Sequence, residues 1–197
     1  MIPFVIVGSG YRSEYFARVA GTYPALFKAL YLCRSQEKAD AVQEKTGIPA
    51  TTSMDRCMAF LPAFAVIAVD RGHVADVSAE WVSRGFPVLT ETPFASTPEQ
   101  IRQLEMLAKG GAKIVCCEQY HRQPLLSAAL KEIGNGLIGK PYSMYISAVH
   151  DYHAPSIIRK ALHIEPDEPY QLSSFPSGCW PVHQPEPEHG IGCSLCK

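Results

Sequence analysis

The sequence lacks the features that attract nucleic acids or membranes. Eighteen basic and nineteen acidic residues give a formal charge of −1, and the sequence contains no run of Lys or Arg that would bind phosphate backbones or anionic lipids. The N-terminus carries no basic leader, and its apolar stretch IPFVIV is far shorter than the roughly 20 residues of a membrane span. We therefore expect a cytoplasmic protein that binds neither nucleic acid nor membrane.

The cysteines do not form a disulfide pattern. Their number, seven, is odd, and Cys33, Cys57, Cys116 and Cys117 lie inside or beside apolar segments, where a free thiol behaves as a small hydrophobic group. We expect free cysteines.

The chain is long enough for one buried domain and part of a second, with 197 residues of which 47% are hydrophobic. Residues 1–118 alternate short β-type runs with helical stretches, a pattern typical of a doubly wound parallel sheet, an α/β fold of the Rossmann type. All but the third of these runs read as buried strands. The runs are FVIV (4–7), ALYLC (29–33), IPATT (48–52), FAVIAV (64–69), PVLTE (87–91) and KIVCCE (113–118).

Helices are expected between these strands. One apolar stripe recurs at helical spacing through Tyr15, Phe16, Val19, Ala20 and Tyr23, and another through Val74, Val77 and Trp81. A further helix begins after Thr97 as N-cap, with Pro98 in its first position and Gln100 placed for the reciprocal capping bond.

A partial α+β domain is expected over residues 119–165. LLSAALKEIGNGLIG (125–139) predicts a helix, PYSMYISAVH (141–150) a strand and PSIIRKALHI (155–164) a second helix. Residues 166–197 are rich in Pro, Cys and His without apolar periodicity, so we expect an irregular tail. Its CxxC pair, Cys193 and Cys196, would suit zinc together with Cys179, His183 and His189, but a second spaced pair is missing, and we expect no metal site. A truncated chain or a shifted reading frame explains this segment better than a zinc site does.

The stretch FVIVGSGYRS (4–13) predicts a phosphate-binding loop. Gly8 allows the sharp turn after the strand and Gly10 lets the backbone approach a pyrophosphate, while Ser13 stands where a third glycine would pack the helix on the strand. The amides of Ser9, Tyr11 and Arg12 complete the loop at the helix N-terminus. The alternative is an ordinary strand-to-helix turn.

The residues after the second strand favour NADP over NAD. An NAD site places an acidic residue there for the ribose hydroxyls, whereas this sequence reads Cys33-Arg34-Ser35. Arg34 can face a 2′-phosphate and stack on adenine, and Ser35 can donate to the same phosphate. Alternatively, Ser35 caps the following helix and Arg34 is solvated.

The segment FAVIAVDRGHVADVSAEWVSRGFPVLTETPFASTPEQIRQL (64–104) resembles the Gfo/Idh/MocA oxidoreductase family, named after glucose-fructose oxidoreductase and inositol dehydrogenase. The resemblance extends over about residues 2–165 and includes the glycine loop, His73, the segment GFPVLTETPFA with Glu91, and GLIGKPYSM (136–144). It implies a nucleotide-binding domain followed by an open sheet domain, hydride transfer between NADP or NAD and a sugar, polyol or related small-molecule substrate, and a possible homo-oligomer. It also implies cofactor contacts from His73 and Glu91.

The chain departs from the family motif Glu-Lys-Pro at its central position, because it reads Glu91-Thr92-Pro93. The family resemblance implies that the lysine helps to move or stabilise the substrate hydroxyl proton. Thr92 can donate one hydrogen bond but lacks the cationic charge of an ammonium group. A catalytically inactive nucleotide-binding protein, a partner-dependent protein or a fragment is therefore the alternative to an enzyme.

His150, Asp151 and His153 form the expected proton-transfer group. Histidine exchanges protons near neutral pH, and Asp151 could orient either ring. Tyr120 and Arg122 are further candidates. The other interpretation is that the three clustered residues cap the following helix and line the surface.

Overall fold

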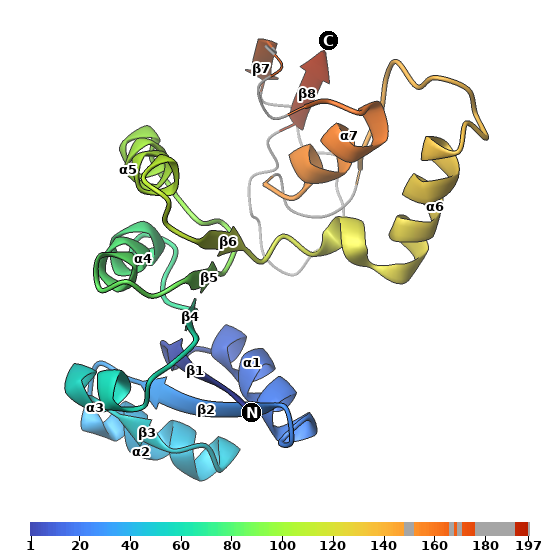
Figure 1. The fold of residues 1–197 in the computed structure, drawn as a ribbon. Coiled ribbons are helices and arrows are strands. Elements are labelled where there is room, and N and C mark those ends of the chain that lie inside the picture. The colour runs from blue at the N-terminus through green and yellow to red at the C-terminus, as the bar shows by residue number, and fades with distance from the viewer. Residues whose placement is uncertain (148–151, 166–167, 169–170, 176–191, 197) are drawn as a thin grey trace. The chain divides into compact units, whose positions relative to one another are not determined.

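The computed structural model describes residues 1–147, 152–165, 168, 171–175 and 192–196. The chain divides into two compact units, Met1–Cys117 and Glu118–Lys197. Figure 1 shows the helices and strands of both units.

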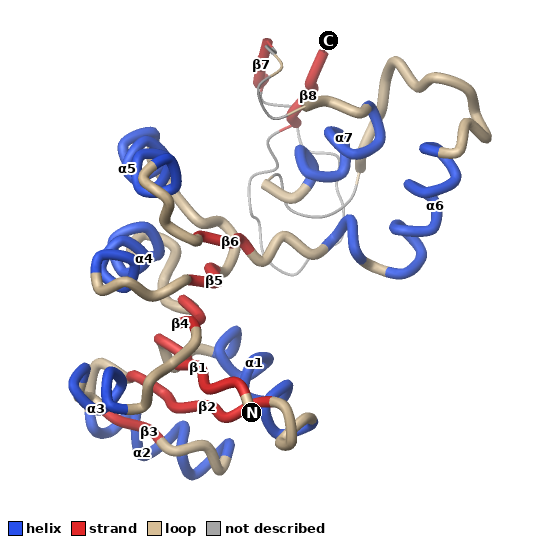
Figure 2. Tube along the Cα trace, in the orientation of Figure 1, coloured by secondary structure: helices blue, strands red, loops and turns tan. Residues whose placement is uncertain are grey.

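The first unit is a six-stranded parallel sheet with the order β3-β2-β1-β4-β5-β6 (Figure 2). This order is that of the dinucleotide-binding Rossmann fold and confirms the expected fold class. The chain order reverses between β1 and β4, so the crevice at this point lies at the carboxyl ends of both strands. The strands are β1 (Ile2–Val7), β2 (Phe27–Leu32), β3 (Ala50–Thr51), β4 (Phe64–Ile67), β5 (Val88–Thr90) and β6 (Ile114–Cys116).

Helices cover both faces of this sheet. They are α1 (Tyr11–Thr22), α2 (Gln36–Thr46), α3 (Met54–Ala59), α4 (Val74–Ser83) and α5 (Pro98–Lys109). Phe4, Ile6 and Tyr31 pack on one face with residues of α1 and α2. Val5 and Leu30 pack on the other face with residues of α3 and α4. Because successive strand residues point to opposite faces, the continuous apolar run of β1 contributes to both cores.

Helix boundaries follow the capping residues. Thr97 is the N-cap of α5, accepting from the Gln100 amide at 3.3 Å, and Pro98 occupies the first turn, as expected. The side chain of Gln100 accepts from the Ser96 amide at 2.8 Å rather than from that of Thr97. Ser35 caps α2 in the same way, and Gly47 ends α2 with a φ of 71°.

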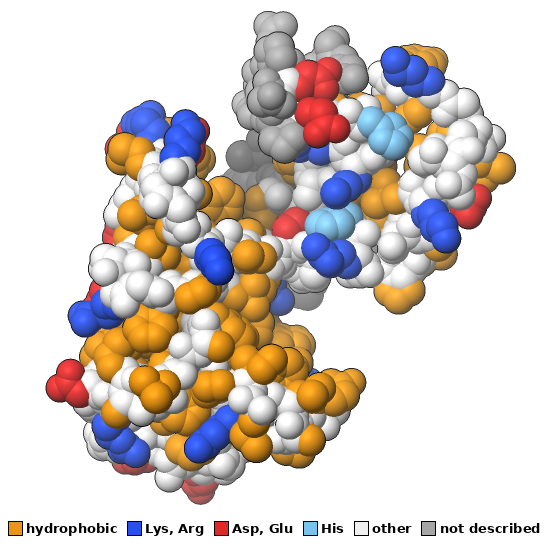
Figure 3. Space-filling view, viewed as in Figure 1, with side chains coloured by type: hydrophobic (Ala, Val, Ile, Leu, Met, Phe, Trp, Pro, Cys, Tyr) orange, Lys and Arg blue, Asp and Glu red, His pale blue; other side chains and the backbone are white. Residues whose placement is uncertain are grey.

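Two expected burial patterns are wrong in the first unit. The buried residues of α1 are Ser13, Ala17 and Ala20, whereas Tyr15 and Val19 are 48% and 44% exposed. Small residues of α1 face the sheet because the helix packs close to it. Figure 3 shows apolar side chains on the surface of this unit. β6 was expected to be buried, but it is the edge strand of the sheet and Val115 is 58% exposed.

The second unit contains a short 3-10 helix η1 (Tyr120–Arg122), two α-helices, α6 (Pro124–Gly134) and α7 (Ala154–Leu162), and the strands β7 (Gln171–Phe175) and β8 (Gly192–Cys196). β7 and β8 pair antiparallel, although this segment was expected to be irregular, because pairing across a long connection leaves no local periodicity. The strand expected over 141–150 is not formed in its described part, residues 141–147. A strand requires a hydrogen-bonded neighbour, and no described residue pairs with this segment.

No helix among the described residues is long and apolar enough to cross a membrane.

Candidate nucleotide-binding site

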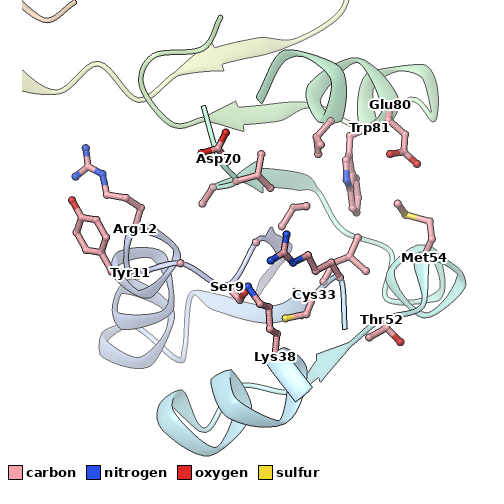
Figure 4. A pocket seen from close by; sticks show the side chains of 18 residues that line it. Ser9, Tyr11, Arg12, Cys33, Lys38, Thr52, Met54, Asp70, Glu80 and Trp81 are labelled. Atoms are coloured by element: carbon pink, nitrogen blue, oxygen red, sulfur yellow. The ribbon is translucent and has the colours of Figure 1, made fainter. Parts of the chain in front are cut away.

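A pocket of about 750 Å³ lies at the carboxyl ends of the strands in the first unit (Figure 4). Its wall is formed by the glycine loop after β1, the segments after β2, β3 and β4, and α4. This is the position at which open α/β sheets bind their ligands. The loop residues that line it are Gly8, Ser9, Gly10, Tyr11 and Arg12.

The two glycines of the loop differ in the space that a side chain would have. Gly8 has a φ of 114°, and a Cβ at this position would lie 2.3 Å from the carbonyl oxygen of Ala68. Gly10 is the N-cap of α1, and a Cβ there would meet no atom within 4 Å. Gly8 is therefore required by the fold, whereas Gly10 leaves open space for a ligand at the helix N-terminus.

Ser13 fits at the position of the third glycine. Its side chain is fully buried, and its hydroxyl donates to the Gly10 carbonyl at 2.6 Å. The Tyr31 hydroxyl donates to the Ser13 carbonyl at 3.2 Å, which ties the first turn of α1 to β2. Serine is accommodated because its hydroxyl finds a backbone acceptor inside the packing contact.

Two basic residues line the pocket beyond β2. Arg34 follows the strand and is exposed, and Lys38 lies in the first turn of α2. Ser35 does not line the pocket. Its hydroxyl oxygen accepts from the Lys38 amide at 3.4 Å, so Ser35 caps α2, as the alternative interpretation of this residue predicts. Burial raises the pKa of the Cys33 thiol, so this wall residue is neutral near pH 7.

An ion pair joins the glycine loop to the segment after β5. Arg12 Nε lies 3.4 Å from Glu91 Oε2, with the arginine side chain 35% exposed and the carboxylate 14% exposed. Next to this pair, the hydroxyl oxygen of Thr92 is buried and has no hydrogen-bond partner in the described part of the chain. Burial, with the charge of Glu91, raises the pKa of the Cys117 thiol to about 12.

His73 lies outside the wall of the pocket. It precedes α4 as its N-cap, its side chain is 73% exposed, and its Nδ1 lies 3.6 Å from Asp70 Oδ1. Asp70 itself lines the pocket. The contact of His73 with a cofactor stays a prediction.

The second unit holds a histidine–carboxylate pair. His153 is 1% exposed, and its Nδ1 lies 2.5 Å from Oε2 of Glu118. The ring of Tyr120 packs on the imidazole with centroids 4.3 Å apart. His150 and Asp151, the other two members of the expected group, lie outside the described residues.

His121 lies in the same unit. Its Nδ1 is buried and has no hydrogen-bond partner among the described residues. Burial, together with the charges of Arg122 and Lys160, lowers the pKa of this imidazole. His121 is therefore neutral near pH 7.

Residues 2–119 match the Gfo/Idh/MocA oxidoreductase family, whose members have an NAD-binding Rossmann fold. The chain belongs to this family. No curated protein matches the chain.

Solved structures of several oxidoreductases share the fold at low sequence identity. An NAD-binding oxidoreductase from Klebsiella pneumoniae is 17% identical to this chain, with a TM-score of 0.72. The match covers 90% of this chain and 56% of the Klebsiella chain. The WlbA dehydrogenase from Bordetella pertussis, in complex with NADH and UDP-GlcNAcA, is 17% identical, with a TM-score of 0.70. The match covers 89% of this chain and 60% of the dehydrogenase. A 3-ketoreductase from Actinomadura kijaniata in complex with NADP is 16% identical, with a TM-score of 0.60. The match covers 72% of this chain and 45% of the ketoreductase. The chain thus spans about half the length of these proteins.

Sequence reasoning missed several residues of this Gfo/Idh/MocA chain that the structure brings to the candidate groups, among them Lys38, Asp70 and Glu118. Lys38 was hidden because the α2 pattern reads as a solvated helix face. Asp70 follows β4 in the same way that Arg34 follows β2, and this position after a strand could have identified it. Glu118 pairs with His153 across 35 positions of sequence, a separation that no local pattern reveals.

Proposed function

We propose that the first unit binds NADP(H) in the pocket at the ends of its strands. The pyrophosphate would be held by the amides that follow Gly8 and Gly10, and the 2′-phosphate by Arg34 and Lys38. The observation that carries this proposal is that two cationic side chains beyond β2, Arg34 and Lys38, line the same pocket as the glycine loop. A guanidinium and an ammonium can together neutralise the 2′-phosphate, which NAD lacks.

Calorimetric titration of two variants tests the cofactor preference. Arg34→Ala and Lys38→Ala should each weaken NADPH binding about tenfold or more, because each removes a charge-assisted hydrogen bond. NADH binding should change little. Arg18→Ala is the matched control, since Arg18 is exposed on α1 and packs against Tyr15 outside the pocket. Equal losses for NADPH and NADH in both variants would contradict the preference.

We propose further that the chain acts in hydride transfer between this cofactor and a sugar, polyol or related small-molecule substrate. A bound nicotinamide would supply or accept the hydride, and the protein would have to exchange the carbinol proton. His153 is suited to this exchange because Glu118 fixes the ring through Nδ1 at 2.5 Å. The roles of His150, Asp151 and Thr92 in catalysis stay proposals.

A second function, nucleotide binding without catalysis, is favoured by Thr92. Its buried hydroxyl has no partner among the described residues and brings no positive charge to the Glu91-Thr92-Pro93 segment. Thr92→Lys distinguishes the two functions. Turnover gained by this variant on a sugar and polyol panel supports a weakened enzyme, whereas no turnover despite NADPH binding supports the binding protein; Thr92→Val controls for loss of the hydroxyl.

We also propose a cytoplasmic location, where Cys33 and Cys57, both free, would stay reduced. Fractionation of the producing cells tests the location. Sedimentation of the purified chain tests the predicted homo-oligomer.

A further inference from the structure

Trp81 carries a polar group that the fold of the first unit leaves unpaired. The residue lies on α4, its side chain is fully buried, and its indole Nε1 has no hydrogen-bond partner in the described part of the chain. Buried tryptophan usually pairs its N–H, because an unmade hydrogen bond in an apolar surrounding is unfavourable. An acceptor that arrives from outside the chain would remove this penalty.

The same residue forms part of the pocket wall. Trp81 and the preceding residue, Glu80, both line the pocket, and Figure 4 shows the two side chains extending from α4 with Met54 beside them. The Trp81 ring is held in place by Phe86, with ring centroids 5.8 Å apart in an edge-to-face arrangement. An indole fixed in this way directs its N–H without the loss of side-chain freedom that a mobile donor would suffer.

This part of the wall belongs to the adenosine half of a dinucleotide site. Arg34 and Lys38 follow β2, where the adenosine ribose is recognised in this fold. Met54, which begins α3 after β3, packs against the same apolar cluster as Trp81. The base attached to this ribose would therefore lie between the segment after β2 and α4.

We propose that Trp81 and Glu80 together recognise the amino-bearing edge of adenine, an inference that rests on the proposed nucleotide binding. The indole N–H donates to ring nitrogen N1, and the Glu80 carboxylate accepts from the N6 amino group. Glu80 is 48% exposed and pairs with Arg84 through one carboxylate oxygen, Oε1, at 3.0 Å. A surface pair of this kind is weak and leaves the carboxylate able to accept a second bond.

The surroundings of the indole must rearrange for the base to reach it, because Nε1 is buried in the structure. Met54 is half-buried and unbranched, and methionine adapts its shape more easily than any branched apolar residue. The pocket wall thus predicts that binding changes the surroundings of Trp81, which makes its fluorescence a direct reporter.

The first experiment uses this fluorescence. The sequence contains two tryptophans, Trp81 and Trp180, so Trp180→Phe leaves Trp81 as the sole emitter. Titration with oxidised NADP, which does not absorb the emitted light, should shift the emission of Trp81 to saturation with the affinity found by calorimetry. Binding measured by calorimetry with no change in Trp81 emission would overturn the inference.

The second experiment exchanges the base. In the hypoxanthine analogue of NADP, N1 becomes a donor and the amino group becomes a carbonyl, so both proposed contacts are reversed. We expect the full chain to bind NADP about tenfold more tightly than the analogue. Trp81→Phe and Glu80→Gln should each abolish most of this preference, since glutamine can donate to the carbonyl as readily as it accepts from the amine.

Controls separate this inference from the proposed function. Glu44→Gln, which removes an exposed carboxylate of α2 outside the pocket wall, should retain the preference. Because Glu80 is exposed, we expect Glu80→Gln to fold, so this variant still tests the adenine contact if Trp81→Phe does not fold. A wild-type chain that binds NADP and its analogue equally well overturns the adenine contact alone, whereas a chain that binds neither overturns the nucleotide site itself.

Discussion

The Nδ1 atom of His153 lies 2.5 Å from the Oε2 atom of Glu118, and the imidazole between Glu118 and Tyr120 is almost completely buried. This pair joins the first residue of the second unit to the residue that precedes α7. The contact orients the His153 ring, and we expect it to hold the start of α7 within the unit.

Glu118→Gln should destabilise the second unit. The substitution keeps the shape of the side chain but replaces a charged acceptor of a buried imidazole, a loss of about 1–3 kcal/mol in the free energy of unfolding. Hydrogen exchange of the α7 amides measures this loss locally. Glu132→Gln, on the exposed side of α6, is the control. If both variants exchange like the wild type, the pair does not hold α7.

Gly8→Ala and Gly10→Ala should affect different properties. At Gly8 the new methyl group would meet the Ala68 carbonyl oxygen at 2.3 Å in a left-handed backbone conformation, so the free energy of unfolding should fall by at least about 2 kcal/mol. At Gly10 the methyl group meets nothing, and stability should be retained while nucleotide affinity falls. Urea unfolding measures the stability of both variants, and calorimetric titration measures their nucleotide affinity. Loss of stability in Gly10→Ala would show that its role is structural.

The buried thiols predict a loss of stability at alkaline pH. Burial raises the pKa of Cys57 from 9.0 to about 11 and that of Cys117 from 9.0 to about 12. Above pH 9 the unfolded chain therefore releases these protons while the folded chain keeps them, so the stabilising contribution is complete below pH 9 and is lost as pH rises toward 11–12.

The free energy of unfolding should thus be level to about pH 8.5 and then fall by up to about 1.4 kcal/mol per pH unit for each thiol. Urea unfolding between pH 8 and pH 10, followed by Trp81 fluorescence in the Trp180→Phe background, measures the slope. Cys57→Ala should make it shallower. An unchanged slope in this variant would assign the alkaline loss to other groups, among them Tyr31, whose pKa burial also raises.

The Rossmann sheet could be predicted from sequence because its signals are local. Continuous apolar runs such as that of β1, and caps such as Thr97 with Pro98, specify an element without reference to distant residues. The exposed face of α1 was predicted wrongly because aromatic residues at helical spacing look like a core stripe. The helix instead buries Ser13, Ala17 and Ala20, whose small size permits close packing on the sheet.

The candidate site could be predicted only where it follows the chain. Gly8, Gly10 and Arg34 lie directly after strands, and a parallel sheet brings the ends of its strands to one edge. Contacts between residues far apart in sequence, such as the 3.4 Å ion pair of Arg12 with Glu91, leave no such local signal. The orphaned indole N–H of Trp81 likewise becomes visible only once its surroundings are known.

The central claim is that the pocket of the first unit binds a nicotinamide dinucleotide with a preference for the 2′-phosphate. Isothermal titration of the intact wild-type chain, of confirmed mass, with NADPH and then NADH tests it most directly. The account predicts saturable one-to-one binding of both, with NADPH at least about tenfold tighter because of Arg34 and Lys38. No heat of binding with either nucleotide at millimolar concentration, together with an unchanged thermal midpoint, would contradict it.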